Sequence, residues 1–291
     1  MYCPRLDHFV RFNFNGTVSR CGHMVKAPQY DSLESMNASN WLANTKKLMK
    51  LDRWPKECVR CQEVEQQGLD SIRTYALTID NNSDYLQVGG VLDNVCNAAC
   101  LTCNEQLSTR IGSLKSKNFP IYNNLDRFWQ LPQERIQHLD INGGEPSYSK
   151  NYKKLLKQLP PNLKTLRLNT NCNTVLEELV GIANQGIEVT VTVSFDGVGP
   201  VFELVRWPIK WDTFYQNLMT YNTMPVKLNL WTTVSRLNVN DLPNIQSFAQ
   251  EHGIDHSYAY LKEPSALAVE NKDEIAFAAY IAKQKQLRGI V

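Results

Sequence analysis

The sequence predicts an α/β fold built on a parallel sheet, and two observations carry this prediction. From about residue 84 onward, segments with strand character alternate with segments of helical periodicity, as in parallel sheets covered by helices. The chain has 291 residues, 43% of them hydrophobic, which is enough for one large core and a small appendage. We therefore expect one α/β core preceded by a smaller unit.

Six segments of the core have the character of strands, and helical segments separate them. The strands are expected at residues 85–92, 136–141, 163–168, 187–193, 226–234 and 256–261. The helices are expected near residues 105–117, 122–130, 149–158, 174–185, 211–223, 240–252 and 270–287. Ligands of such folds gather at the carboxyl ends of the strands, so the loops that follow the strands are the places to look for a site.

The smaller unit begins with a predicted hairpin. Residues 8–14 and 17–20 have strand character and are joined by Asn15-Gly16, a dipeptide favoured in tight hairpin turns. Such a hairpin would bring Cys3 and Cys21 close together. Residues 31–51 are expected to form one or two helices that pack this unit on the core. We divide the chain into a cysteine-rich module, residues 1–80, and a core, residues 81–291.

Composition and charge exclude several classes of protein. The chain has no run of about 18 apolar residues and no apolar stretch near residue 1, so neither a membrane partner nor secretion is expected. Its eight cysteines form two tight groups and a singleton, Cys172, a pattern typical of metal binding in a reducing compartment, and we expect a cytoplasmic protein. A formal net charge of +2 gives no reason to expect nucleic acid as a partner.

Three cysteines follow the first core strand. Cys96, Cys100 and Cys103 have the spacing C-x3-C-x2-C. Structural zinc takes four ligands, whereas a 4Fe–4S cluster held by three thiolates leaves one iron open to a small molecule. The alternatives are a partial zinc site completed by a distant histidine, or buried thiols that bind no metal.

This spacing resembles the cluster-binding loop of the radical S-adenosylmethionine (SAM) superfamily. The resemblance implies that the open iron binds SAM and that one electron from the reduced cluster cleaves it. The resulting 5′-deoxyadenosyl radical would then remove a hydrogen from the substrate. It also implies that the six strand–helix units form the family's partial (βα)6 barrel, an open relative of the TIM barrel.

The loop after the second core strand is similar to the GGE motif of this family. It contains Gly143, Gly144 and Glu145. Two glycines let the backbone approach a ligand closely, and the carbonyls and the carboxylate can accept hydrogen bonds from the SAM ammonium group.

The end of the fourth core strand resembles the serine–aspartate–glycine strand end of the same family. Ser194 and Asp196 stand there, and Arg206 follows on the next connection. The resemblance implies that Ser194 and Arg206 contact the SAM carboxylate, for which a guanidinium is well suited, and that Asp196 lies near the ribose or the substrate. The alternative is a plain turn at Asp196 and a surface cation at Arg206.

A second cysteine group precedes the first. Cys3, Cys21, Cys58 and Cys61 have the spacing C-x12-G-x4-C followed by C-x2-C. This resembles the cysteine-rich half of the SPASM and twitch modules, which hold an auxiliary 4Fe–4S cluster. The module usually follows the barrel, and a full SPASM module has further cysteines. The resemblance implies one auxiliary cluster with a role in electron transfer, and structural zinc, with His23 as a substitute ligand, stays an alternative.

The resemblance as a whole implies a radical SAM enzyme of the SPASM/twitch type. Its expected substrate is a peptide or protein side chain, and its expected electron donor is a protein such as flavodoxin or ferredoxin. A small molecule or a tRNA base is the second substrate class, and an iron–sulfur or zinc-binding protein without activity is the non-enzymatic alternative. Four residues are candidates for a general acid or base, and proximity to strand ends is the one argument for them: Asp140, Tyr148, Asp196 and Tyr258.

Overall fold

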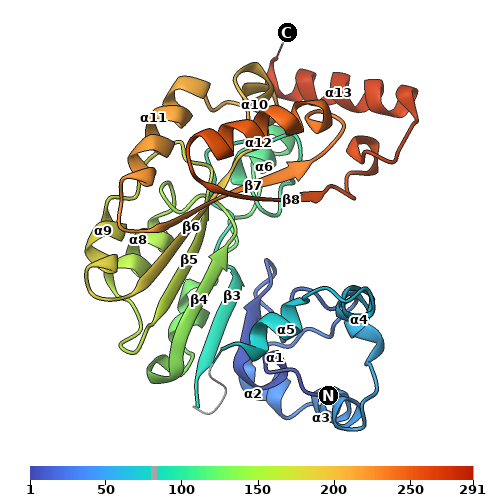
Figure 1. The fold of residues 1–291 in the computed structure, drawn as a ribbon, viewed down its shortest axis with the longest axis vertical. Coiled ribbons are helices and arrows are strands. Elements are labelled where there is room, and N and C mark those ends of the chain that lie inside the picture. The colour runs from blue at the N-terminus through green and yellow to red at the C-terminus, as the bar shows by residue number, and fades with distance from the viewer. Residues whose placement is uncertain (80–83, 291) are drawn as a thin grey trace.

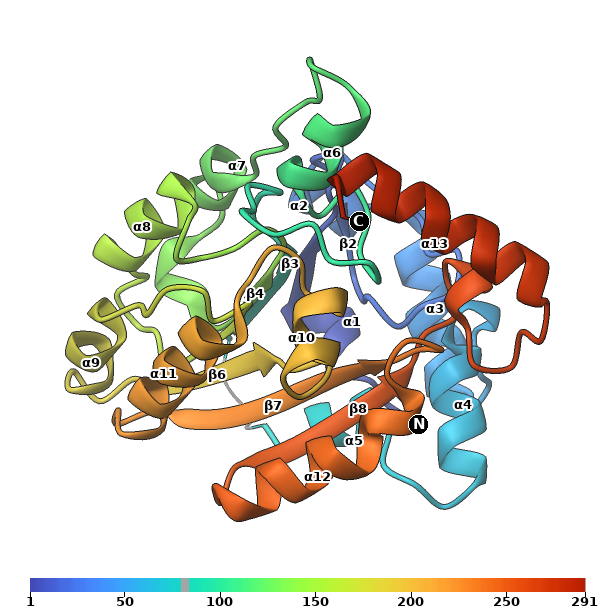
Figure 2. The same ribbon diagram turned by 90° about the horizontal axis from the view of Figure 1, so that it is seen from above.

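One curved sheet forms the centre of the molecule. The computed structural model describes residues 1–79 and 84–290, so the predicted module boundary at residues 80 and 81 lies outside the described residues. The sheet has eight strands in the order β2-β1-β3-β4-β5-β6-β7-β8. β1 and β2 are antiparallel, and all other neighbours are parallel. Because the two end strands, β2 and β8, do not pair with each other, the barrel is open (Figures 1 and 2).

The six predicted core strands are confirmed. Alternation of apolar and polar residues marks β4 to β7, because one face packs on helices. Their bounds are β3 (Leu86–Val91), β4 (Ile136–Asn142), β5 (Thr165–Thr170), β6 (Glu188–Ser194), β7 (Lys227–Val234) and β8 (Asp255–Tyr260).

Helices surround the outer side of this sheet (Figure 2). Those expected in the core are α6 (Thr109–Lys115), α7 (Leu125–Trp129), α8 (Lys150–Lys157), α9 (Glu178–Ala183), α11 (Trp211–Asn222), α12 (Leu242–Glu251) and α13 (Glu274–Arg288). The stretch predicted as one or two helices is two, α2 (Leu33–Asn37) and α3 (Asn40–Lys50). Helices not expected are α1 (Arg5–His8), α4 (Val59–Gln66), α5 (Ile72–Leu77) and α10 (Pro200–Val205). No helix in the described residues has both the length and the hydrophobicity needed to cross a membrane.

The predicted hairpin exists, but it belongs to the main sheet. β1 (Phe9–Phe12) and β2 (Val18–Ser19) are joined by a turn in which Gly16 has a φ of 87°, a value that favours glycine. β1 also pairs in parallel with β3, with Phe9 opposite Gln87. The sheet therefore has eight strands where six were expected for the barrel, and the first 79 residues lie along the β3 edge (Figure 1).

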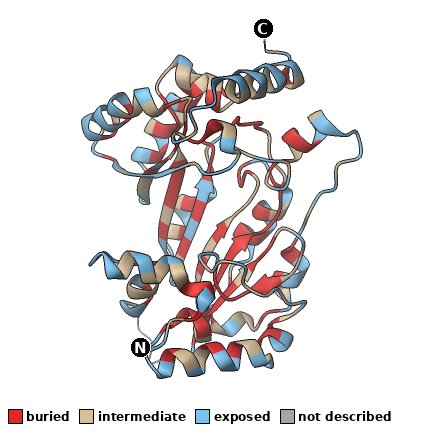
Figure 3. Cartoon of the chain, turned by 90° about the vertical axis from the view of Figure 1, so that its right-hand side faces the viewer, coloured by how far each residue is buried: buried red, intermediate tan, exposed pale blue. Residues whose placement is uncertain are grey.

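The two faces of the sheet differ sharply in polarity. The outer face is apolar: on β5 and β6, residues such as Leu166, Leu168 and Val191 pack on helix residues in the main core (Figure 3). Closed α/β barrels fill their interior with bulky apolar side chains. Here the inner face is polar, so the open barrel is a trough that water and polar ligands can enter. We use "inner face" for the residues that point into it, including Gln87, His138, Asp140, Asn142, Arg167, Asn169, Thr190, Ser194 and Trp231.

Candidate functional site

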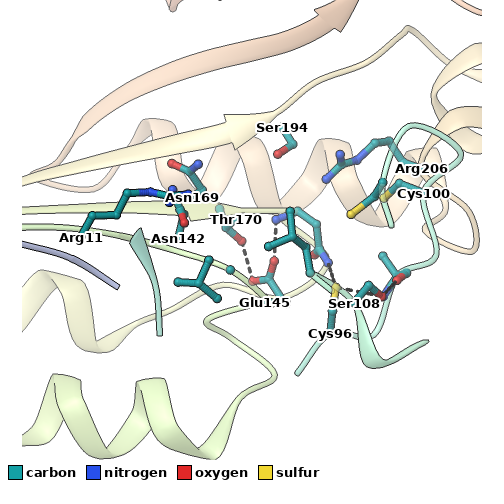
Figure 4. A pocket seen from close by; sticks show the side chains of 17 residues that line it. Arg11, Cys96, Cys100, Ser108, Asn142, Glu145, Asn169, Thr170, Ser194 and Arg206 are labelled. Carbon is teal, nitrogen blue, oxygen red and sulfur yellow. Dashed lines mark hydrogen bonds between the residues drawn. The ribbon is translucent and has the colours of Figure 1, made fainter. Parts of the chain in front are cut away.

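A cavity of about 330 Å³ lies at the carboxyl ends of the parallel strands. Loops after β3, β4, β5 and β6 supply most of its wall (Figure 4). The predicted residues that line it are Cys96, Cys100, Cys103, Gly143, Gly144, Glu145, Ser194 and Arg206. These predicted residues, up to 110 positions apart in the sequence, thus meet around one space.

The loop that carries the three cysteines is held by its backbone. The amides of Ala99 and Leu101 donate to the carbonyls of Trp207 and Val205, each at 2.8 Å. The amide of Ala98 donates to Cys96 Sγ at 3.4 Å. These bonds fix the path of the loop and leave the sulfurs facing the cavity.

Burial controls the protonation of the three thiols. It raises the pKa of Cys103 to about 12 and also raises the pKa values of Cys96 and Cys100, and Cys100 raises those of Cys96 and Cys103 further. Buried thiols of this kind become thiolates when a cation binds them. The donor set therefore suits a metal centre with three sulfur ligands.

The last helix reaches back to the same loop. Arg288 of α13 donates from Nε to the carbonyl of Ala99 at 2.7 Å and from its terminal nitrogen to that of Cys100 at 3.3 Å. Tyr280 Oη donates to the carbonyl of Leu101 at 3.3 Å. α13 is thus a clamp on the cysteine loop.

The two glycines after β4 let this loop touch the cysteine loop. The amides of Gly144 and Glu145 donate to the carbonyls of Asp93 and Val95, both at 2.8 Å. A Cβ at position 144 would lie 2.1 Å from the Val95 carbonyl oxygen, far inside contact distance. Within the described chain, the carbonyls of Gly143 and Gly144 accept no hydrogen bond, so they are available to a ligand in the cavity.

The carboxylate of Glu145 has a structural use. Its side chain is 1% exposed and accepts from Ser147 (amide 3.1 Å, Oγ 2.7 Å), Thr170 Oγ1 (2.7 Å) and the Asn171 amide (2.6 Å). Burial raises the pKa of Glu145, and these donors oppose the rise. Because the carboxylate already has four donors, it joins the β4 and β5 loops; Figure 4 shows two of these bonds.

An ion pair orients the arginine near the cysteines. Arg206 donates to Asp196 at 3.1 Å, and Asp196 also accepts from the Thr233 amide at 2.7 Å. Burial lowers the pKa of Arg206, but Cys100 and Asp196 more than offset this and hold it above its usual value. Asp196 is 1% exposed and does not line the cavity, whereas Arg206 lies beside Cys100 (Figure 4).

These groups together fit a metal centre with an amino-acid ligand. Nε of Arg206 is buried and has no partner among the described residues, and an unpaired buried donor calls for an acceptor. Free carbonyls, an arginine donor and three thiols therefore share one cavity. Within residues 1–79 and 84–290, no group of three or more His, Cys, Asp or Glu side chains is arranged to hold a single metal ion.

The four N-terminal cysteines line a second, smaller cavity of about 20 Å³. Cys3, Cys21 and Cys58 are buried and Cys61 is half-buried. Burial raises the pKa of Cys3 to about 11 and that of Cys58 to about 12, and neighbouring cysteines contribute to both rises. The hairpin thus brings Cys3 and Cys21 together as expected, in apolar surroundings that include Trp54 and Met49.

The acid–base candidates separate into different environments. Asp140 lies on the inner face, Tyr148 is 57% exposed, and Tyr258 is on the outer face of β8, opposite Thr232. The sequence motifs do not include Arg11, Asn142 and Asn169, which also line the cavity of about 330 Å³. We call this cavity the upper cavity. Each of the three residues alternates with apolar residues along its strand. This alternation predicts a polar inner face only if the barrel interior is known to be polar.

Comparison with known proteins gives only distant similarities. No protein-family model and no curated protein matches the chain. It is similar to SuiB of Streptococcus suis bound to S-adenosylmethionine, with a TM-score of 0.49 and 16% identity over 87% of this chain and 61% of that one. Against SuiB bound to the precursor peptide SuiA, the TM-score is 0.48 with 16% identity over 85% and 60%. Against anSMEcpe with bound AdoMet, it is 0.45 with 14% identity over 69% and 62%. The chain spans 60–62% of the length of these structures.

Proposed function

We propose that this protein is a radical SAM enzyme. One observation carries the proposal: the C-x3-C-x2-C loop, the Gly143-Gly144 turn and Arg206 line a single cavity at the carboxyl ends of parallel strands. Cys96, Cys100 and Cys103 would hold a 4Fe–4S cluster. When bound, the cluster and SAM supply a 5′-deoxyadenosyl radical that removes a hydrogen atom from the substrate.

The residues of the chain bind and orient the SAM amino-acid group in this proposal. The carbonyls of Gly143 and Gly144 accept from the ammonium group, since the chain leaves them unused. Arg206 and Ser194 donate to the carboxylate, and Asp196 keeps the guanidinium in place. Glu145 contributes by fixing the loops that hold these groups.

The proposal includes an auxiliary 4Fe–4S cluster at Cys3, Cys21, Cys58 and Cys61. Four buried or half-buried thiols that face one space support it. A cluster with four protein thiolates has no open iron, so its proposed role is electron transfer rather than substrate binding. A structural zinc at this site is the competing outcome of the test below.

A peptide or protein side chain is the proposed substrate, and a flavodoxin- or ferredoxin-type protein the proposed reductant. The trough supports a substrate of this size, because it is open between β2 and β8 and lined by hydrogen-bonding side chains. Trp231, 38% exposed on the inner face opposite Ser194, offers an aromatic surface beside the upper cavity.

Anaerobic reconstitution tests the proposal. Two cubes require about eight irons per chain, whereas one cube and one zinc require about four. Dithionite and SAM should release 5′-deoxyadenosine from the wild type and not from Cys100→Ala. Cys172→Ala removes a buried cysteine outside both groups and should keep both iron and activity. A reconstituted wild type that binds no iron, or cleaves no SAM, contradicts the proposal.

A further inference from the structure

A third cavity, which we call the lower cavity, lies on the inner face, toward the amino ends of the strands. Its volume is about 160 Å³, and it shares no lining residue with the upper cavity. The two lie on the same strands: β4 gives His138 and Asp140 to the lower cavity and Asn142 to the upper one. α5 covers the lower cavity from the side, with Ile72 and Tyr75.

The lower cavity contains two arginines that form no ion pair among the described residues. Burial raises the pKa of Asp140 and both arginines lower it, and Arg5 also lines the cavity of the N-terminal cysteines. Arg5 is 8% exposed, and its Nε is buried without a hydrogen bond; its one strong contact is the Phe9 ring, 3.5 Å from the guanidinium carbon. Arg167 is exposed on the inner face. Among the described residues, the side chains of Arg5, Arg167 and Asp140 enter no hydrogen bond or ion pair.

The lining charges of this cavity that form no ion pair sum to a positive balance. Asp140 is the one lining acid without a cation at ion-pair distance, because Glu188 pairs with Lys227 at 2.9 Å. Two guanidinium groups therefore face one free carboxylate. Burying the Arg5 guanidinium without a partner is unfavourable. A ligand carboxylate could accept hydrogen bonds from Arg5 and from the exposed Arg167.

We propose that the lower cavity binds a carboxylate of the peptide substrate through Arg5 and Arg167. This inference rests on the proposed function, since it takes the substrate to be a peptide. Arg167 is opposite Thr190, and Ser194 lies four residues further along β6, a rise of about 13 Å at ~3.3 Å per residue. An extended peptide covers ~3.3–3.6 Å per residue. Allowing for the reach of the arginine side chain, the acidic group lies about two to four residues from the residue that loses hydrogen.

A binding experiment on the reconstituted full chain tests this site. The probe is a library of N-acetylated hexapeptides randomised at every position, made in one set with a free C-terminal carboxylate and in another with an amide. If the site binds a side-chain carboxylate, the wild type should enrich Asp or Glu in both sets. If it binds a terminal carboxylate, the wild type should bind peptides of the first set alone. Absence of any bound peptide in both sets, or binding of the amide set without an acidic preference, overturns the inference.

Charge variants supply the decisive comparison. Arg167→Gln should weaken binding of an enriched peptide about tenfold, the effect of one charge-assisted hydrogen bond. Arg167→Glu should shift the preference from acidic to basic residues, a result that a merely structural role does not produce. Lys210→Gln removes a cation whose partner, Glu203, lines neither the upper nor the lower cavity, and it should keep the acidic preference. Equal acidic enrichment in the wild type and Arg167→Glu would overturn the inference.

Failure of the inference is separable from failure of the proposed function. SAM cleavage to 5′-deoxyadenosine is measured in the same preparations without peptide. If cleavage occurs but no acidic preference is found, the carboxylate site is wrong and the radical SAM proposal stands. If cleavage is absent, the proposed function fails whatever the library binds.

Discussion

At the scale of single residues, the candidate site depends on a contact between two backbones. Gly144 lies against Val95, and a methyl group there would overlap the Val95 carbonyl. The hydrogen bonds from Gly144 and Glu145 to Asp93 and Val95 form because the loops can come this close. The glycines thus serve the contact between loops as well as access to a ligand.

Gly144→Ala should separate the two loops. We expect a loss of about 1–3 kcal/mol in the free energy of unfolding and weaker retention of iron at the three-cysteine loop. Gly181→Ala is the control, because a Cβ at position 181 of α9 meets nothing within 4 Å; this change should stabilise by about 0.5–1 kcal/mol. Urea denaturation and iron analysis measure both effects. Equal behaviour of the two variants would contradict the described contact.

At the scale of elements, α13 and the α4–α5 pair hold the two cysteine sites. α13 supports the three-cysteine loop through Arg288, which is buried. α4 carries Cys61 and is tied to α5 by Glu65, which accepts from Arg73 Nε at 2.9 Å and from Ser71 Oγ at 2.6 Å. Each site therefore depends on an element, α13 or α5, that supplies no cysteine itself.

Arg288→Ala should make the proposed cluster at the three-cysteine loop labile. Loss of a charge-assisted hydrogen bond costs about 1.5–3 kcal/mol, so opening of the loop becomes at least about tenfold more frequent. The visible absorbance of the reconstituted protein should therefore bleach faster in air. Lys283→Ala, an exposed change on the same helix, should bleach at the wild-type rate. A wild-type rate for Arg288→Ala would show that α13 does not stabilise the loop.

Glu65 should make stability dependent on pH. Its hydrogen bond with Arg73 lowers the pKa of Glu65, and partial burial opposes this. A lowered pKa means stability that is present above the ordinary carboxyl value of about 4.3 and is lost as pH falls through the folded value. Glu65→Gln should cost about 1–2 kcal/mol near pH 7, with the difference from the wild type disappearing at acid pH. Glu63→Gln, exposed on the same helix, should match the wild type in denaturation at every pH.

At the scale of the whole molecule, the N-terminal segment and the core share one sheet. β1 pairs with β3 over four residues, and Arg11 of β1 lines the upper cavity. If the N-terminal segment were an independent module, the core would have to protect the edge of β3 by other means, such as a covering loop or a very short strand. Here β1 covers it, so the first 79 residues complete the core.

A chain that begins at residue 84 should therefore fold poorly. Removal of β1 exposes the hydrogen-bonding edge of β3, and such edges promote association. We expect aggregates in size-exclusion chromatography and little bound iron. A monomeric truncated chain with the thermal midpoint of the full protein would show instead that the N-terminal segment is dispensable for the fold.

The sequence predicts the local elements better than their long-range partners. Four of the core strands, β4 to β7, are recognisable because their apolar residues alternate, and this alternation is set by packing on helices. The pairing of β1 with β3 cannot be recognised in this way, because it joins residues 78 positions apart and leaves no local pattern in the sequence. The motifs predict Cys96, Gly144 and Arg206 at one cavity, but the burial of Asp196 follows from its ion pair with Arg206, which only the tertiary structure brings about.

The position of Arg288 has a consequence for the order of events during synthesis. The loop that it clamps lies 188 residues earlier in the chain. Until the ribosome has released residue 288, the carbonyls of Ala99 and Cys100 lack these donors. The proposed cluster would therefore enter a fully clamped loop only after residue 288 has been synthesised, and a nascent chain stalled before α13 presents its cysteines on a loop without this support.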